Sequence, residues 1–264
     1  MALLDGKVAI VSGAAQGLGE AYARALAENG ASVVAFDVQG SIVEVAASIA
    51  ADTGQRVDGV VADVSLKEDC QRIVLDTVAN FGGFDILINN AGTWKETPVD
   101  SSWEQAVADW DFIMDTNLKG VLMLSRLAVP HLQARGGGDI VNISTYYVLP
   151  ARSNGTNQAH TDLYNASKWA LNGFTDAWAK SLAEHNIRVN GQCMGATDTP
   201  MLRGLFDDNQ LPPDMAAVVM QPSDIAQQMI DLIEDGRSGE NIGAWVGYPI
   251  ELSPTPAPHR LVSG

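Results

Sequence analysis

The sequence predicts an α/β fold, a doubly wound parallel sheet of about seven strands with helices on both faces. Short apolar stretches of strand length alternate with longer segments of helical periodicity along the whole chain. One such strand runs straight into a glycine-rich turn at residues 12–19. Acidic or amide side chains follow several strands where they end, which is the edge at which such sheets bind ligands.

Length and composition indicate one acidic globular domain over residues 1–264. No repeat or linker divides the 264 residues, and the charged side chains give a net charge of −16. Such a surface repels nucleic acid and anionic membranes, so we expect neither as a partner. The apolar stretches are too short to span a membrane. The two cysteines, Cys70 and Cys193, are far apart, and no metal-ligand spacing occurs, which favours a cytoplasmic protein without disulfide or metal.

The first unit of the chain has the order strand, turn, helix, strand. A buried strand at Lys7–Val11 leads through the turn into a helix at Glu20–Asn29, which Gly30 closes. A second strand at Ser32–Phe36 ends on Asp37. This is the order and length of a dinucleotide-binding βαβ unit, and it predicts a Rossmann-type domain.

The three glycines of the turn have separate uses in such a site. Gly13 permits the tight turn, Gly17 lets the backbone approach a pyrophosphate, and Gly19 lets the helix pack closely on the sheet. The phosphates would then lie at the helix N-terminus.

Asp37 decides which dinucleotide we expect. A carboxylate at this strand end can accept hydrogen bonds from both ribose hydroxyls and would repel a 2′-phosphate. Neither Ala15 nor Gln16 supplies a cation to attract one. The sequence therefore predicts NAD in preference to NADP.

The remaining chain continues the alternation of strands and helices. We expect strands at residues 57–62, 85–89, 139–143, 187–192 and 244–246. Helices are expected at residues 41–53, 65–80, 102–133, 164–184 and 224–234, with Ser41, Ser65 and Ser223 as helix caps. Residues 200–222 are expected to form a substrate lid, and residues 248–264 a proline-rich tail.

Tyr164 and Lys168 are four residues apart and share one face of a predicted helix. A phenol ordinarily keeps its proton to about pH 10, but a nearby ammonium group favours the phenolate and lowers that pKa. Such a tyrosine can take or return a proton on an alcohol or carbonyl oxygen while hydride moves elsewhere. We predict that this pair is catalytic.

Together these motifs resemble the short-chain dehydrogenase/reductase (SDR) family, from Leu4 to about Val246. The resemblance implies that Asp63 and Val64 contact the adenine. It also implies that Asn117 holds a water on a proton relay from Lys168 and that Thr197 contacts the nicotinamide amide. The cofactor-binding residues it implies are Gly13, Gln16, Gly17, Leu18, Gly19, Asp37, Asp63, Val64, Asn90, Ala91, Gly92, Tyr164, Lys168, Thr197 and Thr199.

The sequence departs from the family pattern in two places. The family commonly has two serines at the end of the fifth strand, where this chain has Ser144-Thr145. Register puts Thr145 in the catalytic position, with Ser144 as the alternative. The interval from there to Tyr164 is also longer than usual, and the added residues would extend over the mouth of the site. The second departure is Met194, where the family usually has proline.

The resemblance implies an NAD-dependent oxidoreductase that interconverts a secondary alcohol and its ketone. Apolar residues in the lid and at Trp94 and residues 146–149 favour an apolar substrate such as a cyclic terpenoid, an aromatic alcohol or a steroid-like compound. The alternatives are a cis-dihydrodiol dehydrogenase of aromatic catabolism, a 3-oxoacyl-type reductase, and a non-catalytic NAD-sensing protein. We expect a homodimer or homotetramer, formed through the long helices around Asn117 and Trp169.

Overall fold

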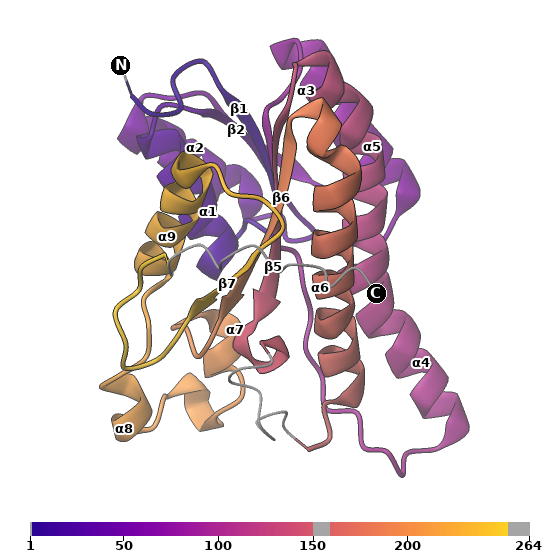
Figure 1. Ribbon diagram of the computed structural model, residues 1–264. Coiled ribbons are helices and arrows are strands. Elements are labelled where there is room, and N and C mark those ends of the chain that lie inside the picture. Colours follow the sequence, from indigo (N-terminus) through magenta and orange to yellow (C-terminus); the bar gives the residue numbers. More distant parts are fainter. Residues whose placement is uncertain (1, 150–158, 253–264) are drawn as a thin grey trace, which may run out of the picture.

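The computed structural model describes residues 2–149 and 159–252. One parallel sheet of seven strands runs through the molecule in the order β3-β2-β1-β4-β5-β6-β7, and helices cover both of its faces (Figure 1). The strands are β1 (Val8–Ser12), β2 (Ser32–Asp37), β3 (Val57–Val61), β4 (Ile86–Asn89), β5 (Gly138–Thr145), β6 (Ile187–Met194) and β7 (Asn241–Ala244). The predicted fold is confirmed, and the strand order reverses between β1 and β4, the place where such sheets bind ligands.

Two hydrophobic cores hold the layers together, one on each face of the sheet. One face carries α1 (Gly17–Glu28), α2 (Ile42–Thr53) and α9 (Pro222–Asp235), and the other carries α3 (Lys67–Phe81), α5 (Val121–Ala134) and α6 (Asp162–Leu182) (Figure 1). Strand β1 is buried along its whole length, because it contributes side chains to both cores.

The long helix predicted at residues 102–133 is interrupted. It consists of α4 (Trp103–Met114), a π-helical segment (Asp115–Gly120) and α5. A Cβ atom on Gly120 would lie 2.7 Å from Val64 Cγ2, so the absence of a side chain lets this segment approach the end of β3. The π-helical segment is therefore a product of tertiary packing, which helical periodicity does not reveal.

Other boundaries differ from the sequence prediction. The predicted serine caps were wrong: Ser41 has helical backbone angles and no capping bond, α3 begins after Leu66, and α9 begins at Pro222. Strand β7 ends at Ala244, where we expected it to begin.

The predicted lid has a fixed base. Thr197 and Met220 form a parallel bridge, and the Asp198 N–H donates to the Met220 carbonyl at 2.9 Å. Between them lie the short helices α7 (Pro200–Arg203) and α8 (Pro213–Ala216). Most of the added residues before Tyr164, at 150–158, and the tail beyond 252 lie outside the described residues. Across the described ranges, none of the helices has the length and apolar character of a membrane span.

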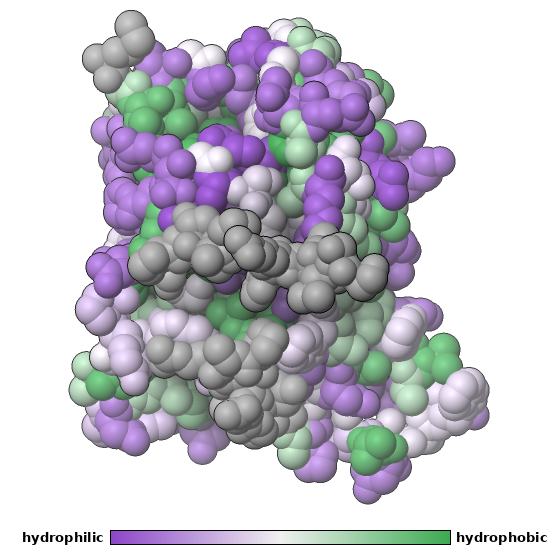
Figure 2. All heavy atoms as spheres, in the orientation of Figure 1, coloured by the Kyte–Doolittle hydropathy of each residue, from purple (hydrophilic) through white to green (hydrophobic). Residues whose placement is uncertain are grey.

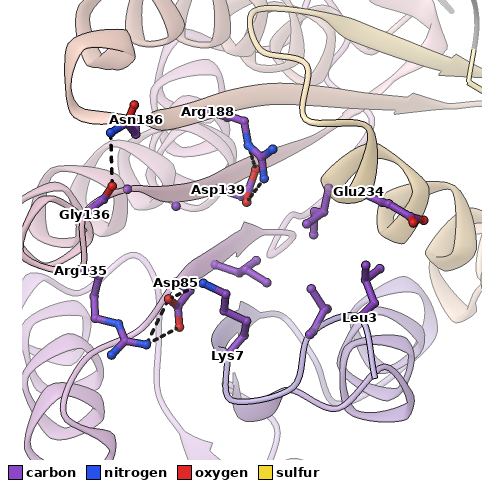
Figure 3. A pocket seen from close by; sticks show the side chains of 14 residues that line it. Leu3, Lys7, Asp85, Arg135, Gly136, Asp139, Asn186, Arg188 and Glu234 are labelled. Atoms are coloured by element: carbon purple, nitrogen blue, oxygen red, sulfur yellow. Dashed lines mark hydrogen bonds and ion pairs between the residues drawn. The ribbon is translucent and has the colours of Figure 1, made fainter. Parts of the chain in front are cut away.

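Ion pairs join the amino-terminal ends of the central strands around a cavity of about 390 Å³ (Figure 3). The Asp85 carboxylate accepts from Lys7 Nζ at 3.2 Å, from Arg135 Nη2 at 3.0 Å and from the Val8 N–H at 3.0 Å. Burial alone would raise the pKa of Asp85, but these hydrogen bonds outweigh it and hold the pKa below its ordinary value. Asp85 thereby fixes the start of β1 to the start of β4.

At Asp139, on the neighbouring strand β5, burial has a larger effect on the carboxyl pKa than hydrogen bonding. Arg188 donates to it twice, at 2.8 and 2.6 Å. Burial nevertheless raises the pKa of the Asp139 carboxyl, because desolvation outweighs the guanidinium.

Asp85→Asn should destabilise the protein by about 2 kcal/mol at pH 7, since an amide loses the charge-assisted bonds to Lys7 and Arg135. A carboxyl group with a lowered pKa stabilises the fold above its unfolded pKa of about 4 and loses that effect as pH falls through the folded value. Urea unfolding of both proteins should therefore show a difference that shrinks in acid. A pH-independent difference would contradict this account, and Asp52→Asn, on an exposed ion pair, is the control.

Candidate active site

The glycine turn joins β1 to α1, and at Gly13 and Gly19 it leaves no room for a side chain. Gly13 and Gly17 have φ of +66° and +60°, a region that favours glycine. A Cβ atom on Gly19 would lie 2.0 Å from the Gly13 carbonyl oxygen, which is closer than any side chain can approach. At the start of α1, Gln16 is exposed and makes no capping bond, whereas Leu18 packs against the core. The first N–H groups of α1 are thus left without a side-chain cap, as a phosphate site requires.

The segment after β4 is bonded directly to this turn. Asn90 Nδ2 donates to the carbonyls of Ser12 and Gly13 at 3.0 and 2.9 Å. The Ser12 hydroxyl accepts from the N–H groups of both Asn90 and Ala91 at 3.0 Å. Ser12 was not among the predicted site residues, because only the fold brings its hydroxyl to β4. These bonds hold the predicted cofactor-binding residues of the two strands in one rigid unit.

Asp37 lies buried at the end of β2, beside the glycine turn. Its Oδ2 accepts from the Ala15 N–H at 3.1 Å, and its Oδ1 accepts from the Gln39 N–H at 3.0 Å. The sequence around it, residues 12–19 and 38–41, contains no lysine or arginine. This is a carboxylate oriented by backbone groups, as the NAD prediction requires.

Asp63 and Val64 follow β3, at the same carboxyl-terminal edge of the sheet as the glycine turn and Asp37. Asp63 Oδ1 accepts from the Ser65 N–H at 2.8 Å, which fixes the turn after the strand. Val64 is buried against Gly120 of the π-helical segment. The adenine contact remains a prediction for both residues.

Tyr164, in the first turn of α6, meets the end of β5. The Thr145 side chain lies close to its hydroxyl and acts to lower the pKa of Tyr164. The Ser144 hydroxyl instead donates to the Lys168 carbonyl at 3.4 Å, and Ser144 lies opposite the buried Cys193 on the neighbouring strand. Of the two candidate hydroxyls, the one at Thr145 is therefore the one that contacts the tyrosine.

Lys168 is buried one turn further along α6. Its ammonium group donates to the Ile143 carbonyl at 2.9 Å and lies 5.9 Å from the centre of the Tyr164 ring. Burial lowers the pKa of Lys168 to about 8. Burial also raises the pKa of Tyr164 to about 12, although the Thr145 side chain opposes this. The lowered tyrosine pKa expected from the sequence is thus not found here, because desolvation dominates in the protein alone.

Asn117 lies in the π-helical segment and is fully buried. Its Oδ1 accepts from the Thr93 N–H at 2.7 Å, and its Nδ2 donates to the Thr93 carbonyl and to Ser167 Oγ. A Cβ atom on Gly92 would lie 3.5 Å from both Asn117 Oδ1 and Lys168 Nζ. Asn117 therefore lies near the Lys168 ammonium group, and its side-chain amide holds the backbone of Thr93, the residue after Gly92. The water relay remains a prediction.

Thr197 and Thr199 stand at the base of the lid. Thr197 Oγ1 donates to the Gly195 carbonyl at 3.1 Å, and Thr199 Oγ1 accepts from the Leu202 N–H at 3.3 Å, which caps α7. The Thr199 methyl group would lie 3.3 Å from a Cβ atom on Gly17. The lid base and the glycine turn are therefore neighbours across the same edge of the sheet.

One edge of the sheet thus brings together a glycine turn, an oriented carboxylate and a buried Tyr–Lys pair, the arrangement of a dinucleotide-dependent dehydrogenase. In the described parts of the chain, no group of three or more His, Cys, Asp or Glu side chains is placed to bind a metal. The chain belongs to the SDR family of oxidoreductases, because residues 7–210 match the family described as short chain dehydrogenase.

Relatives and solved structures agree with this assignment. The chain is 32% identical to the 3-oxoacyl-(acyl-carrier-protein) reductase FabG of Thermotoga maritima, over 91% of this chain and 96% of that one. It is 34% identical to a cis-4-hydroxycyclohexanecarboxylate dehydrogenase of Sinomonas cyclohexanicum, over 88% and 91%. A crystal structure from Sinorhizobium meliloti 1021, assigned as a short-chain alcohol dehydrogenase, gives a TM-score of 0.80 at 32% identity, covering 91% of this chain and 95% of that one.

Thr145→Ala should lower kcat by about a hundredfold, the usual effect of removing a hydrogen-bond donor that stabilises a reacting oxygen. Ser144→Ala should change kcat by less than about fivefold, because this hydroxyl faces Lys168 and Cys193 instead. Steady-state kinetics of both variants make the measurement, and Thr145→Ser should retain most of the rate. A larger loss in Ser144→Ala than in Thr145→Ala would transfer the role to Ser144.

Proposed function

We propose that this protein is an NAD-dependent alcohol dehydrogenase or carbonyl reductase that interconverts an apolar secondary alcohol and its ketone. The observation that carries the proposal is that Thr145 at the end of β5 lies beside the Tyr164 hydroxyl, with the buried Lys168 ammonium 5.9 Å from the Tyr164 ring. Two hydroxyl groups can then bind one substrate oxygen, and one of them can exchange a proton with it.

The chain's own groups divide the chemistry among them. Tyr164 would accept the proton of the substrate hydroxyl in its phenolate form, which the positive charge of a bound oxidised nicotinamide would favour against the effect of burial on its pKa. Thr145 donates to the same oxygen as its charge develops. Lys168 holds its charge beside the Tyr164 ring and, with Asn117, would return the proton to solvent. NAD, when bound, accepts the hydride that leaves the substrate carbon. In the opposite direction, Tyr164 donates the proton to a carbonyl oxygen.

The protein fits a dinucleotide in three respects. The N-terminus of α1 has no side-chain cap, the glycine turn has no Cβ atoms in the way, and the Asp37 carboxylate is held at the strand end. Asp37 and the absence of lysine or arginine from residues 12–19 and 38–41 favour NAD over NADP.

The apolar substrate class rests on the residues around the lid. Met201, Leu205 and Val218 of the lid are exposed, and such apolar side chains suit an uncharged alcohol. The similarity to a dehydrogenase of a hydroxycyclohexanecarboxylate supports a cyclic alcohol among the candidates. A cis-dihydrodiol is the second candidate and would use the same residues. The similarity to FabG supports 3-oxoacyl reduction as a third candidate. Asp37 disfavours this reaction where NADPH is the reductant, because its carboxylate repels the 2′-phosphate.

We also propose that the protein acts in the cytoplasm as a homodimer or homotetramer. Helix α4 exposes Trp103, Trp110 and Phe112, and α6 exposes Trp169. Figure 2 shows hydrophobic side chains among polar ones where α4 lies. Burying such side chains between copies would stabilise an assembly. Among the described residues both cysteines are free and buried, which suits a reducing compartment.

Tyr164→Phe should lower kcat at least about a hundredfold, because general acid–base catalysis contributes that much or more. Binding of NADH should be unchanged, since the phenyl ring still fills the same space. Absorbance of NADH formed from NAD and a panel of apolar alcohols measures the first, and fluorescence titration measures the second. Tyr248→Phe, at an exposed tyrosine, is the control. A variant with near-normal kcat would remove Tyr164 from the proposed mechanism.

Asp37→Asn should weaken NAD and improve the relative use of NADP. The charge-assisted bonds to the ribose and the repulsion of a 2′-phosphate both depend on the carboxylate charge, and about 1.4 kcal/mol corresponds to a tenfold change. We expect KM for NAD to rise about tenfold, and the ratio of kcat/KM for NADP to that for NAD to rise by more. The exposed Asp52→Asn serves as the matched control. Wild-type protein that prefers NADP would refute the cofactor proposal directly.

A further inference from the structure

We propose that Tyr146 makes this site select ring-shaped over linear secondary alcohols. The inference rests on the proposed function and adds to it a residue that selects substrates by their shape. Tyr146 directly follows Thr145, whose side chain lies beside the Tyr164 hydroxyl. Consecutive Cα atoms are about 3.8 Å apart, so the backbone of Tyr146 lies next to the residue that would hold the substrate oxygen.

The Tyr146 ring is held from two sides by packing. A Cβ atom on Gly195 would lie 3.2 Å from the ring carbon Cδ1, so the ring covers this glycine. The Trp245 ring meets it edge-on at 5.6 Å, and the Tyr147 ring lies 4.3 Å away. We call Tyr146, Tyr147 and Trp245 the aromatic shelf. Gly195 follows the end of β6 and is two residues before Thr197 at the lid base, so the aromatic shelf lies next to the lid base.

The backbone under Tyr146 is equally constrained. Residues Tyr146–Val148 form a 3₁₀ turn, closed by the Leu149 N–H donating to the Tyr146 carbonyl at 3.1 Å. Val148 is fully buried, and its carbonyl accepts from Asn172 Nδ2 at 2.9 Å. Asn172 is on the face of α6 that carries Tyr164 and Lys168, four residues beyond the lysine. The catalytic helix therefore positions the aromatic shelf as well as the Tyr–Lys pair.

A rigid aromatic surface discriminates between substrates by shape. Tyr146 is only half-buried, so part of the residue remains accessible for contact with a substrate. A ring substrate can lie against that surface without losing internal rotations, whereas a linear alcohol must give up several rotatable bonds to make the same contact. The expected consequence is a higher kcat/KM for cyclic alcohols.

The test compares cyclohexanol with (R)- and (S)-2-hexanol, which have equal carbon numbers. In each oxidation the hydride goes to NAD, the hydroxyl proton goes to Tyr164, and NADH absorbance reports the rate. Wild-type protein should prefer cyclohexanol. Tyr146→Ala should lower kcat/KM for cyclohexanol about tenfold and for 2-hexanol less than about threefold, whereas Tyr146→Phe should keep the wild-type preference. Asn172→Ala should shift the preference in the same direction, with its kcat pH profile unchanged.

A second measurement locates the Tyr146 ring without using activity. Gly195→Ala should lower the melting temperature of wild-type protein, because the new Cβ atom meets the ring, and lower it less in the Tyr146→Ala background. Leu75→Ala, at an exposed position of α3, is the control for both experiments.

The outcomes separate this inference from the proposed function. Equal losses for cyclic and linear alcohols in Tyr146→Ala, in a folded variant, would overturn the role of Tyr146 and leave the dehydrogenase intact. Wild-type protein that oxidises neither alcohol class but retains NADH binding would overturn the proposed substrate class and the inference with it.

Discussion

The bond from the buried Lys168 ammonium to the Ile143 carbonyl is the interaction on which the site depends. It joins the catalytic helix to the end of β5, next to the residue pair that presents Ser144 and Thr145. A buried charge is unfavourable without strong compensation, and the pKa of Lys168, lowered to about 8, records that cost. Stability alone would favour an apolar side chain here. The lysine is therefore best understood as a functional group that the surrounding fold keeps in place at some expense in stability.

The polar groups beneath the site explain how the fold tolerates this. Asn89 of β4 donates to Asn142 of β5 and to Ser125 of α5, and Asn142 donates to Thr175 of α6. These side chains are all buried, so their hydrogen bonds fix the relative positions of two strands and two helices. Asn89 Oδ1 has no partner among the described residues, which is a local cost within an otherwise satisfied network. The same face of α6 then carries Tyr164, Lys168 and Asn172 toward the end of β5.

The sequence was most informative where function constrains residue type locally. The glycine turn, Asp37 and the Tyr164–Lys168 spacing are short-range patterns, and each lies where the fold was expected to place it. The errors arose where tertiary contacts decide. The π-helical segment depends on Gly120 approaching Val64, a residue far from it in the sequence. Ser41 precedes α2 as expected but makes no capping bond, whereas α3 and α9 begin at other residues than the predicted serines imply.

Two features of the site could not be predicted from the sequence, because they depend on how the fold buries and orients side chains. Proximity of Lys168 suggested a lowered pKa for Tyr164, but the sign of the shift depends on how much water the fold removes. The choice between Ser144 and Thr145 likewise depends on which hydroxyl turns toward α6 at Tyr164 and which toward Cys193. Neither the sign of the pKa shift nor the orientation of a hydroxyl can be read from the spacing of residues in the sequence.

The acidity of the whole chain finally bears on how it can hold a dinucleotide. A protein with a net charge of −16 repels a pyrophosphate at long range, and neither the glycine turn nor residues 38–41 contain a lysine or arginine. Attraction must then come from neutral donors, namely the uncapped N–H groups at the start of α1, whose aligned dipoles act over a short distance. Because such donors require close approach, the absence of Cβ atoms at Gly13, Gly17 and Gly19 becomes a condition for binding rather than a detail of the turn.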